Sequence, residues 1–296
     1  MSGAQLPPVT HGAIAASVVA KFLASSGMTI DELMLALVPQ AQTFARPPIS
    51  NFLVGAVSQG ASGSLYLGAN YEFVGQALSF TVHGEQAATA QAIANGETGL
   101  QRLAVSAAPC GYCRQFLYEL DTAATLQILL PNTPASLLTA LLPDAFGPSD
   151  LGVTAALMSP QAHDLLLPPD ITDPVAEAAL AAANRSYAPY TSSFAGVALK
   201  TADGNLFTGL VAENAAFNPS MSPLEGAVVN LVISGGKSYS DIVDAVLVEA
   251  AGSQASQLAV TRAVLESITS VKLRAYLAQT AHAKGGEFIH VRGPRN

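Results

Sequence analysis

Two short motifs in this chain carry the residue types best suited to metal chemistry. Residues 81–86 contain His83 and Glu85, and residues 109–114 contain Cys110 and Cys113, the only two cysteines of the sequence. Two thiolates and one imidazole are ligands that zinc prefers, and three protein ligands leave a fourth position open for water. Glu85 can take a proton from such a water without being a ligand itself. The motifs therefore predict a catalytic zinc site.

Two other uses of these residues have to be weighed. Cys110 and Cys113 have the spacing of a redox disulfide motif, but the nearby His83 favours shared metal ligation. A purely structural zinc site needs a fourth protein ligand, and none is evident. The remaining histidines stand at no metal-ligand spacing; they are His11, His163, His282 and His290.

The elements around the motifs indicate how the ligands would meet. The pattern predicts a helix from His83 to about Asn95, a strand over residues 103–107, and a second helix beginning at Cys110. Two helix N-termini would then converge on one point, where their amide groups and dipoles stabilise thiolates. Another strand is expected over residues 126–130, which completes an α/β layered domain.

A region rich in apolar and small residues precedes the motifs. We expect helices over residues 11–45, broken at Ser25–Gly27, with Thr29 or Asp31 as a cap. A buried strand is predicted over residues 52–57, a turn over 58–64 and a hairpin partner over 65–68. Asn70 and Glu72 follow at the strand end on one face, where they could hold a sugar diol or simply be hydrated.

The second half of the chain repeats the first with offsets of 140 to 143 residues. Residues 192–194 align with 50–52, Gly209 with Gly68, and Glu213 with Glu72. Residues 224–227 align with 84–87, so that a glutamate survives as Glu225 and Pro223 replaces His83. Residues 249–256 align with 106–113, which replaces the two cysteines by Ser253 and Ser256. We interpret this as a duplication whose second copy lost its metal.

These patterns divide the chain into four parts. We expect an N-terminal helical segment over residues 1–45, a catalytic zinc domain over 46–149, a proline-rich linker over 150–170, and a degenerate, non-catalytic copy over 171–296. The catalytic domain closes in the rigid turn of residues 142–148, which presents Phe146.

Composition limits the possible partners. Only 11% of the 296 residues are charged and the net charge is −8, which argues against a nucleic-acid partner. Scarce charge also favours a subunit partner that covers part of the surface. The apolar stretch of residues 13–24 is interrupted by Lys21 and is typical of an amphipathic helix, not of a signal peptide. We expect no membrane span and a reducing cytoplasm, which keeps both thiols available to metal.

The combination H-x-E followed by P-C-x-x-C is the signature of zinc deaminases of nucleobases. The chain resembles the cytidine deaminases, and in particular the long homodimeric kind with a degenerate second copy. The resemblance runs from about Ile30 to the end of the chain. Its densest matches are residues 49–52, 68–73, 81–86, 108–116 and 142–148.

The resemblance implies a fold, a reaction and a set of site residues. The fold is a three-layer α/β/α arrangement present in two tandem copies, and the reaction is the deamination of cytidine and deoxycytidine in pyrimidine salvage. One zinc ion per chain is held by His83, Cys110 and Cys113, and Glu85 shuttles protons. The substrate-binding residues it implies are Asn70 and Glu72 for the ribose, Phe52 for the pyrimidine face, Gly84 for the ring edge, and Phe146, Ala216 and Phe217 reaching into a neighbouring subunit's site.

Two departures and two rival functions accompany the resemblance. Gly84 and Tyr112 stand where other members often have Ala and His, and neither is a zinc ligand. A deaminase of another base or of a polynucleotide is disfavoured by the low basic content and by the Asn70 and Glu72 pair. A catalytically silent nucleoside-binding or structural zinc protein is disfavoured by the intact set of ligands and Glu85.

Overall fold

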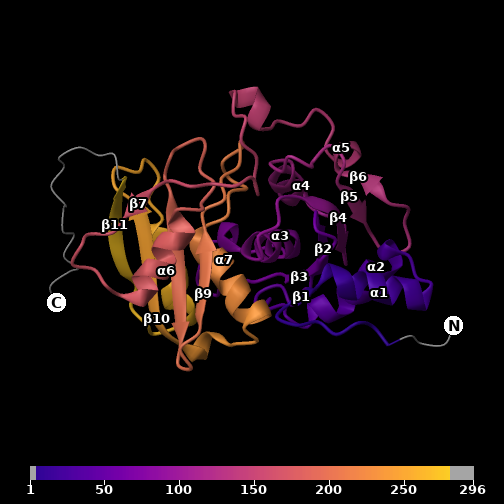
Figure 1. The fold of residues 1–296 in the computed structure, drawn as a ribbon, viewed down its shortest axis with the longest axis horizontal. Helices are drawn as coiled ribbons and strands as arrows, with labels where there is room; N and C mark the ends of the chain where they lie inside the picture. Colours follow the sequence, from indigo (N-terminus) through magenta and orange to yellow (C-terminus); the bar gives the residue numbers. More distant parts are fainter. Residues whose placement is uncertain (1–4, 281–296) are drawn as a thin grey trace. The chain divides into compact units, whose positions relative to one another are not determined.

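The computed structural model describes residues 5–280, which form two compact units (Figure 1). The first unit holds the chain up to Ser159 together with two later segments, residues 214–219 and 232–236. The second unit holds residues 160–213 and 220–231 and the chain from Lys237 onward. His282 and His290 lie outside the described residues. Each unit is built on its own mixed sheet.

The sheet of the first unit has the strand order β1-β3-β2-β4-β5-β6, in which β4 and β5 are parallel and the other pairs are antiparallel. Its strands are β1 (Ala13–Ile14), β2 (Gly55–Gly60), β3 (Leu65–Ala69), β4 (Leu100–Val105), β5 (Gln127–Leu129) and β6 (Ser136–Leu137). Its helices are α1 (Ala16–Ser26), α2 (Ile30–Gln42), α3 (Gly84–Ala94), α4 (Gly111–Leu117) and α5 (Leu138–Leu141), with 3₁₀ turns at Leu78–Phe80 and Pro148–Leu151.

Two glycines show that helices cover both faces of this sheet. A Cβ on Gly55 in β2 would lie 2.5 Å from the carbonyl oxygen of Val38 in α2. A Cβ on Gly68 in β3 would lie 2.2 Å from the amide nitrogen of Ala88 in α3. Because Gly55 pairs with Ala69, the neighbour of Gly68, the two glycines point to opposite faces. The first unit is therefore a three-layer α/β/α structure, as expected, with helix backbones packed directly on the strands.

The helical N-terminal region forms as predicted from Ala16 onward, whereas Ala13 and Ile14, which were expected in a helix, form β1 and pair with β3. α1 ends at Gly27, which takes the left-handed conformation with φ 73°. Thr29 is the N-cap of α2, where its side chain accepts a hydrogen bond from the amide of Glu32 in a capping box. Among the described residues no single helix can span a membrane; only α1 and α2 taken together have the necessary length and composition, and they are bent by 112°.

Several element boundaries differ from the prediction; the strand expected over residues 103–107, for example, is β4, Leu100–Val105. The strand expected over residues 52–57 begins at Gly55 and runs to Gly60, because the side chain of Asn70 holds the preceding residues in a loop. Its amide group donates to the carbonyl of Phe52 at 2.9 Å, and its oxygen accepts from the amide of Val54 at 2.9 Å. The helix that begins at Cys110 ends at Leu117, and Leu120 instead forms a bridge with Leu157.

The second unit has a sheet of the order β7-β11-β10-β8-β9. Its strands are β7 (Leu165–Leu166), β8 (Ala195–Thr201), β9 (Leu206–Leu210), β10 (Ile242–Ala250) and β11 (Arg274–Thr280). The helical elements of the second half of the chain are α6 (Pro174–Ala183), α7 (Pro223–Val229), α8 (Leu258–Ile268), a π-helical turn (Asn230–Ser234) and a 3₁₀ turn (Tyr239–Asp241). Because β7 pairs with β11, the later part of the expected linker belongs to this sheet.

The glycine pattern of the first unit recurs in the second. A Cβ on Gly196 in β8 would meet the backbone of Ala179 in α6 at 2.3 Å, and one on Gly209 in β9 would meet the backbone of Pro223 in α7 at 2.1 Å. Helices thus cover both faces of the second sheet by the same close approach. The predicted duplication of an α/β/α unit is present in the structure.

Candidate active site at two helix N-termini

The three predicted zinc ligands meet at the N-termini of α3 and α4. His83 is the N-cap residue of α3, Cys110 is the N-cap residue of α4, and Cys113 lies three residues further along α4. The Nδ1 atom of His83 lies 3.2 Å from the Sγ atom of Cys113 and 3.6 Å from that of Cys110. The two Sγ atoms are 3.7 Å apart.

These separations fit a tetrahedral zinc ion. Zinc bonds of about 2.3 Å to sulfur and about 2.0 Å to nitrogen, at tetrahedral angles, place two sulfurs about 3.8 Å apart and a sulfur and a nitrogen about 3.5 Å apart. The observed distances lie close to these values, and the ligand atoms all lie within 4.8 Å of one another. No other group of three such residues occurs among residues 5–280. The site therefore fits zinc with one coordination position left for a small molecule.

The two cysteines differ in acidity. The pKa of the Cys110 thiol falls to about 5, chiefly because of its hydrogen bond with the Cys113 thiol, and the amides at the start of α4 and the His83 ring add to this effect. The pKa of Cys113 is raised, because its proton is held by Cys110 and because the side chain is buried. Cys110 is thus the first thiolate available to a metal.

Glu85 follows His83 in the first turn of α3 and is 4% exposed. Burial raises the pKa of its carboxyl, while the nearby His83 and Cys113 act in the opposite direction. A buried carboxyl whose pKa is raised can both accept and return a proton. The structure therefore gives Glu85 the surroundings of a proton shuttle.

The predicted sugar-binding pair shapes the loop that precedes β2. The carboxylate of Glu72 accepts hydrogen bonds from the amides of Ile49 and Ser50 and from the Ser50 hydroxyl. Although burial acts to raise it, these hydrogen bonds lower the pKa of Glu72. Asn70 holds the next part of the loop, and Phe52 stands on it with 59% of its surface exposed. The side chains of Asn70 and Glu72 thus hold one loop by hydrogen bonds, and Phe52 stands on that loop.

The other predicted residues lie on loops held by α4. Phe146 is fixed through its carbonyl, which accepts a hydrogen bond from the side chain of Gln115 at 2.6 Å. Ala216 and Phe217 belong to the loop of residues 214–219, which is part of the first unit. Their predicted role toward a neighbouring subunit stays a prediction. Within one chain this loop lies against the helix that carries the two cysteines.

Sequence reasoning did not assign a role to the α4 residues that hold these loops. Tyr112 and Gln115 are three residues apart on one side of α4, and Glu119, four residues further, lies in the turn that follows the helix. The Tyr112 hydroxyl donates to the carbonyl of Asn218 at 2.7 Å, and the Glu119 carboxylate accepts from the amide of Ala215 at 3.0 Å. The spacing was a readable signal, but the partner loop lies about 100 residues away in the sequence.

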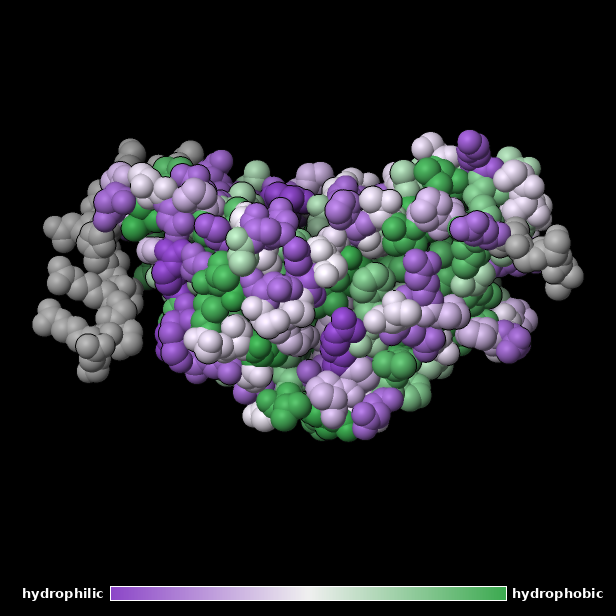
Figure 2. Space-filling model, turned by 90° about the horizontal axis from the view of Figure 1, so that it is seen from below, coloured by the Kyte–Doolittle hydropathy of each residue, from purple (hydrophilic) through white to green (hydrophobic). Residues whose placement is uncertain are grey.

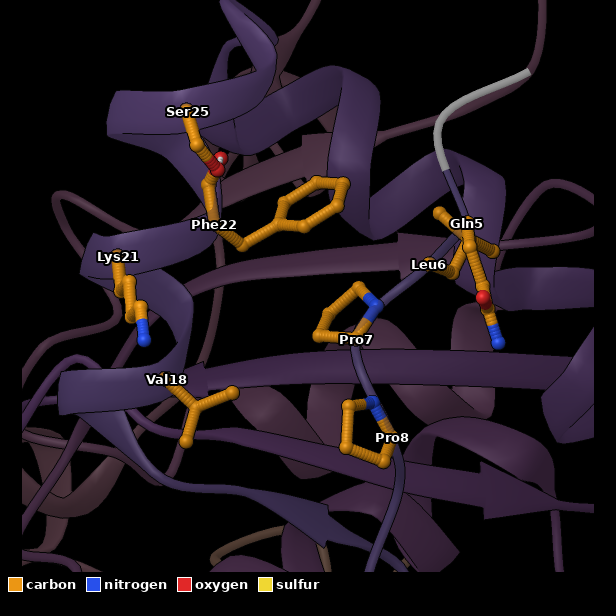
Figure 3. A pocket seen from close by; sticks show the side chains of 8 residues that line it. All are labelled: Gln5, Leu6, Pro7, Pro8, Val18, Lys21, Phe22 and Ser25. Atoms are coloured by element: carbon orange, nitrogen blue, oxygen red, sulfur yellow. Dashed lines mark hydrogen bonds between the residues drawn. The ribbon is translucent and has the colours of Figure 1, made fainter.

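A surface groove of about 480 Å³ lies elsewhere, along α1 (Figure 3). Val18, Lys21, Phe22 and Ser25 of α1 face the N-terminal stretch of residues 5–8 across it. The Ser25 hydroxyl is already bonded to the carbonyl of Phe22, so Lys21 is the one charged group of the lining. None of the predicted site residues lines this groove, and it is separate from the metal ligands.

Comparisons with known proteins agree with this site. Two family models, both described as the cytidine and deoxycytidylate deaminase zinc-binding region, match residues 28–128 and residues 138–262. The fold and the ligand set are thus those of a zinc-binding deaminase. The cytidine deaminase of Aeromonas hydrophila is 49% identical over 256 residues, 86% of each chain, and that of Photobacterium profundum is 47% identical over 246 residues, 83% of this chain and 82% of its own. The chain belongs to the cytidine deaminase family.

One solved structure is also similar in sequence. The crystal structure of cytidine deaminase from Mycobacterium tuberculosis is 32% identical to this chain, covers 40% of it and 99% of its own length, and has a TM-score of 0.38.

The structure corrects the pairing of the two copies that the sequence indicated. Asn51 and Ser192 both have left-handed backbones, with φ 57° and 56°, so the loops before β2 and β8 align at an offset of 141 residues. In the same register Glu213 accepts hydrogen bonds from Tyr190 and Thr191 as Glu72 does from Ile49 and Ser50. The counterpart of Phe52 is therefore Ser193. The sequence alignment had paired Phe52 with Phe194, and that pairing is wrong.

The helix that follows has a different offset. Val82 bridges to Tyr71 in the first unit and Met221 bridges to Ala212 in the second, an offset of 139 residues at the start of the helix. The N-cap residue of α7 is Ser222, so it corresponds to His83, and Leu224 corresponds to Glu85. The prediction that the catalytic glutamate survives as Glu225 is therefore wrong.

Glu225 occupies instead the place of Gln86. In the first unit the side chain of Gln86 accepts from the amide of the N-cap residue His83, and in the second the side chain of Glu225 accepts from the amide of the N-cap residue Ser222. By position in the helix, the cysteines also correspond to other residues than expected, since α8 has Gln257 at its N-cap and Val260 three residues later. Ser253 and Ser256 precede this helix.

Glu225 should make the stability of the protein depend on pH. Burial raises the pKa of Glu225 to about 7, from an ordinary value of 4.5. Because the folded state binds this proton more tightly than the unfolded state, the stabilisation is complete below about pH 4.5 and is lost as the pH rises toward 7. Glu225→Gln keeps the capping group and removes the titration. Relative to the wild type, the variant should gain about 3 kcal/mol between pH 4.5 and 8.

Urea unfolding of both proteins at pH 5 and pH 8 measures this difference. Glu266→Gln is the matched control, because it removes a carboxylate of α8 that is 44% exposed and should alter the pH dependence little. Equal pH dependence of Glu225→Gln and the wild type would show that Glu225 is not protonated in the folded protein.

Proposed function

We propose that this protein catalyses the zinc-dependent hydrolytic deamination of cytidine and deoxycytidine to uridine and deoxyuridine with release of ammonia, a reaction of pyrimidine salvage. The observation that carries the proposal is the convergence of His83, Cys110 and Cys113 on one point beside the buried carboxyl of Glu85. Curated relatives with up to 49% identity bear the name cytidine deaminase.

Each residue of the site has a defined task in this reaction. A zinc ion held by the three ligands would act as a Lewis acid and lower the pKa of a water molecule. Glu85 would accept a proton from the attacking water, whose oxygen bonds to the ring carbon that bears the amino group, and would pass this proton to the ring nitrogen. It would then take the proton of the resulting hydroxyl group and give it to the amino group as the C–N bond breaks and ammonia leaves, so that its carboxyl returns to its starting state. The backbone of Gly84 lies next to Glu85 and would meet the polar edge of the ring.

The sugar and the base would be held by the loop before β2. Its anchor Glu72 keeps a lowered pKa and stays ionised, which suits it to accept hydrogen bonds from ribose hydroxyls. Asn70 fixes the backbone on both sides of Leu53, and thereby sets where the exposed ring of Phe52 stands. We assign Phe52 to the face of the pyrimidine, and Asn70 and Glu72 to the ribose.

The proposed domain organisation is the one that the sequence patterns indicate. Residues 46–149 form the catalytic domain after an N-terminal helical segment, and residues 171–296 form a copy without catalytic residues. The counterparts of His83, Glu85 and Phe52 in that copy are Ser222, Leu224 and Ser193, which supports one zinc ion per chain and not two.

We further propose that the protein is a cytoplasmic homodimer that binds neither nucleic acid nor membrane. Both cysteines are free thiols, as a reducing compartment would keep them. Hydrophobic side chains reach the surface among polar ones on the face shown in Figure 2. Size-exclusion chromatography that finds only monomer would refute the dimer. Large apolar side chains of the loops around the site are exposed in the single chain: Ile49, Phe52, Leu53, Val74, Leu78, Phe146 and Phe217.

An absorbance assay tests the proposed reaction. The zinc-loaded protein should deplete cytidine and deoxycytidine and release ammonia, while cytosine, CMP and adenosine are turned over at least about tenfold more slowly. Faster turnover of adenosine or cytosine would establish a deaminase of another substrate. No turnover of any of these compounds, with zinc bound, would favour the catalytically silent alternative.

A further inference from the structure

The loop of residues 214–219 has a backbone that would not hold its shape alone. Phe217 takes the left-handed conformation with φ 62°, which is rare and costly for an aromatic residue, and its side chain is 61% exposed. Bonds inside the loop support this turn, since the amide of Phe217 donates to the carbonyl of Asn214 and that of Ala216 to the Asn214 side chain. Such a conformation persists only where the surroundings fix it.

α4 and the turn that follows it supply those surroundings. The side chain of Asn214 donates to the backbone carbonyl of Gln115 at 2.9 Å, and the amide of Ala215 donates to Glu119 at 3.0 Å. At the other end of the loop, the Tyr112 hydroxyl donates to the carbonyl of Asn218 at 2.7 Å. Phe217 lies between these two attachments, so both ends of the strained segment are tied to the helix that carries Cys110 and Cys113.

Tyr112 differs from Gln115 and Glu119 because it also contacts the proposed zinc ligand His83. Its ring stacks on the imidazole of His83, with ring centroids 5.4 Å apart and an angle of 25° between the planes. One side chain therefore contacts the metal ligand through its ring and the loop through its hydroxyl. Tyr112 stands between Cys110 and Cys113 in the sequence, and its hydroxyl is bonded to the loop of residues 214–219.

We propose that Tyr112 is a positioning residue that fixes the loop of residues 214–219 against the zinc ligand His83. Its ring limits the rotation of the imidazole, and its hydroxyl holds the loop that carries Phe217. This inference deepens the proposed function, because it rests on the assignment of His83 to zinc and on the implied role of Phe217 at the nucleoside site of a neighbouring subunit. The proposal predicts that a substitution can remove the contact of the Tyr112 hydroxyl with the loop while the ring keeps its contact with His83.

Tyr112→Phe removes the hydroxyl and keeps the ring. In the zinc-loaded full chain, hydrogen exchange of residues 213–221 should rise at least about threefold, because the attachment of the loop through Asn218 is lost and only the longer hydrogen bond from Gln86 to the carbonyl of Pro219, at 3.4 Å, remains at that end. The KM for cytidine should rise roughly fivefold, the factor that corresponds to one hydrogen bond of about 1 kcal/mol, with kcat nearly unchanged. The rate at which zinc passes to EDTA should stay within about twofold of the wild type.

Tyr112→Ala removes both contacts and should release zinc to EDTA at least about threefold faster than Tyr112→Phe does. Tyr118→Phe is the matched control, since Tyr118 follows the last residue of α4 and its hydroxyl makes no hydrogen bond with any of residues 5–280. The control should leave hydrogen exchange, KM and zinc release unchanged.

Two results would overturn the proposal. One is wild-type exchange of residues 213–221 in Tyr112→Phe, which would mean that the hydroxyl does not hold the loop. The other is equally fast zinc release from Tyr112→Phe and Tyr112→Ala, which would mean that the ring does not support His83. Hydrogen exchange and zinc release need no turnover, so they decide the role of Tyr112 even if the wild type does not deaminate cytidine.

Discussion

Glu85→Gln should abolish turnover of cytidine while the protein keeps its zinc. The substitution retains the size of the side chain and leaves His83, Cys110 and Cys113 in place, but an amide cannot take a proton from water and return it. General acid–base catalysis contributes up to about 10⁴-fold, and Glu85 would act in several proton transfers, so kcat should fall by about 10⁴-fold or more. The absorbance assay measures the rate, and metal analysis of the purified variant measures the zinc.

The matched control is Glu225→Gln, which makes the same chemical change at a buried carboxyl near the start of α7. This variant should keep the activity of the wild type, since Glu225 corresponds to Gln86 and caps a helix. A kcat of Glu85→Gln near that of the wild type would remove Glu85 from the mechanism. Loss of zinc from Glu85→Gln would instead show that the carboxyl supports the metal.

Cys113→Ala should lose both the zinc and a large part of the stability of the first unit. Cys113 is fully buried, and it lies closer to His83 Nδ1 than Cys110 does. A set of two ligands holds zinc far more weakly than a set of three, and a metal that binds only the folded state contributes about 2.7 kcal/mol when present at 100 times its Kd. The variant should lose at least that stabilisation, and its unfolding should not respond to added EDTA.

Metal analysis gives the zinc content of Cys113→Ala, and thermal unfolding with and without EDTA gives the stability. Ser253→Ala is the control, because the sequence alignment placed Ser253 opposite Cys110 while the structure places it before α8, bonded to the carbonyl of Ala250. It should bind one zinc ion per chain, like the wild type. Unchanged zinc in Cys113→Ala would contradict the ligand assignment, and two zinc ions in the wild type would contradict a metal-free second copy.

The sequence motifs were sufficient to predict the proposed metal site, because the site is assembled from local features. Cys110 and Cys113 are three residues apart at the start of one helix, and His83 begins another, so each motif sets the direction of its own side chains. The strands and helices around them followed from hydrophobic patterns of similar short range. The glycines that repeat in both halves, Gly68 and Gly209, revealed the duplication for the same reason, since each is required by a close approach of a neighbouring helix.

The register of the repeat and the attachments of the loops could be recognised only in the tertiary structure. Two residues fewer between Ala212 and Met221 than between Tyr71 and Val82 shift the second helix, which a sequence alignment without a fold cannot place. Only hydrogen bonds and helix caps showed that Glu225 is the counterpart of Gln86.

The contact of Tyr112 with Asn218 joins residues 106 positions apart, and it depends on how distant segments pack. No pattern along the chain encodes such a contact, because the free energy that selects it comes from packing of the whole unit and not from its local segments.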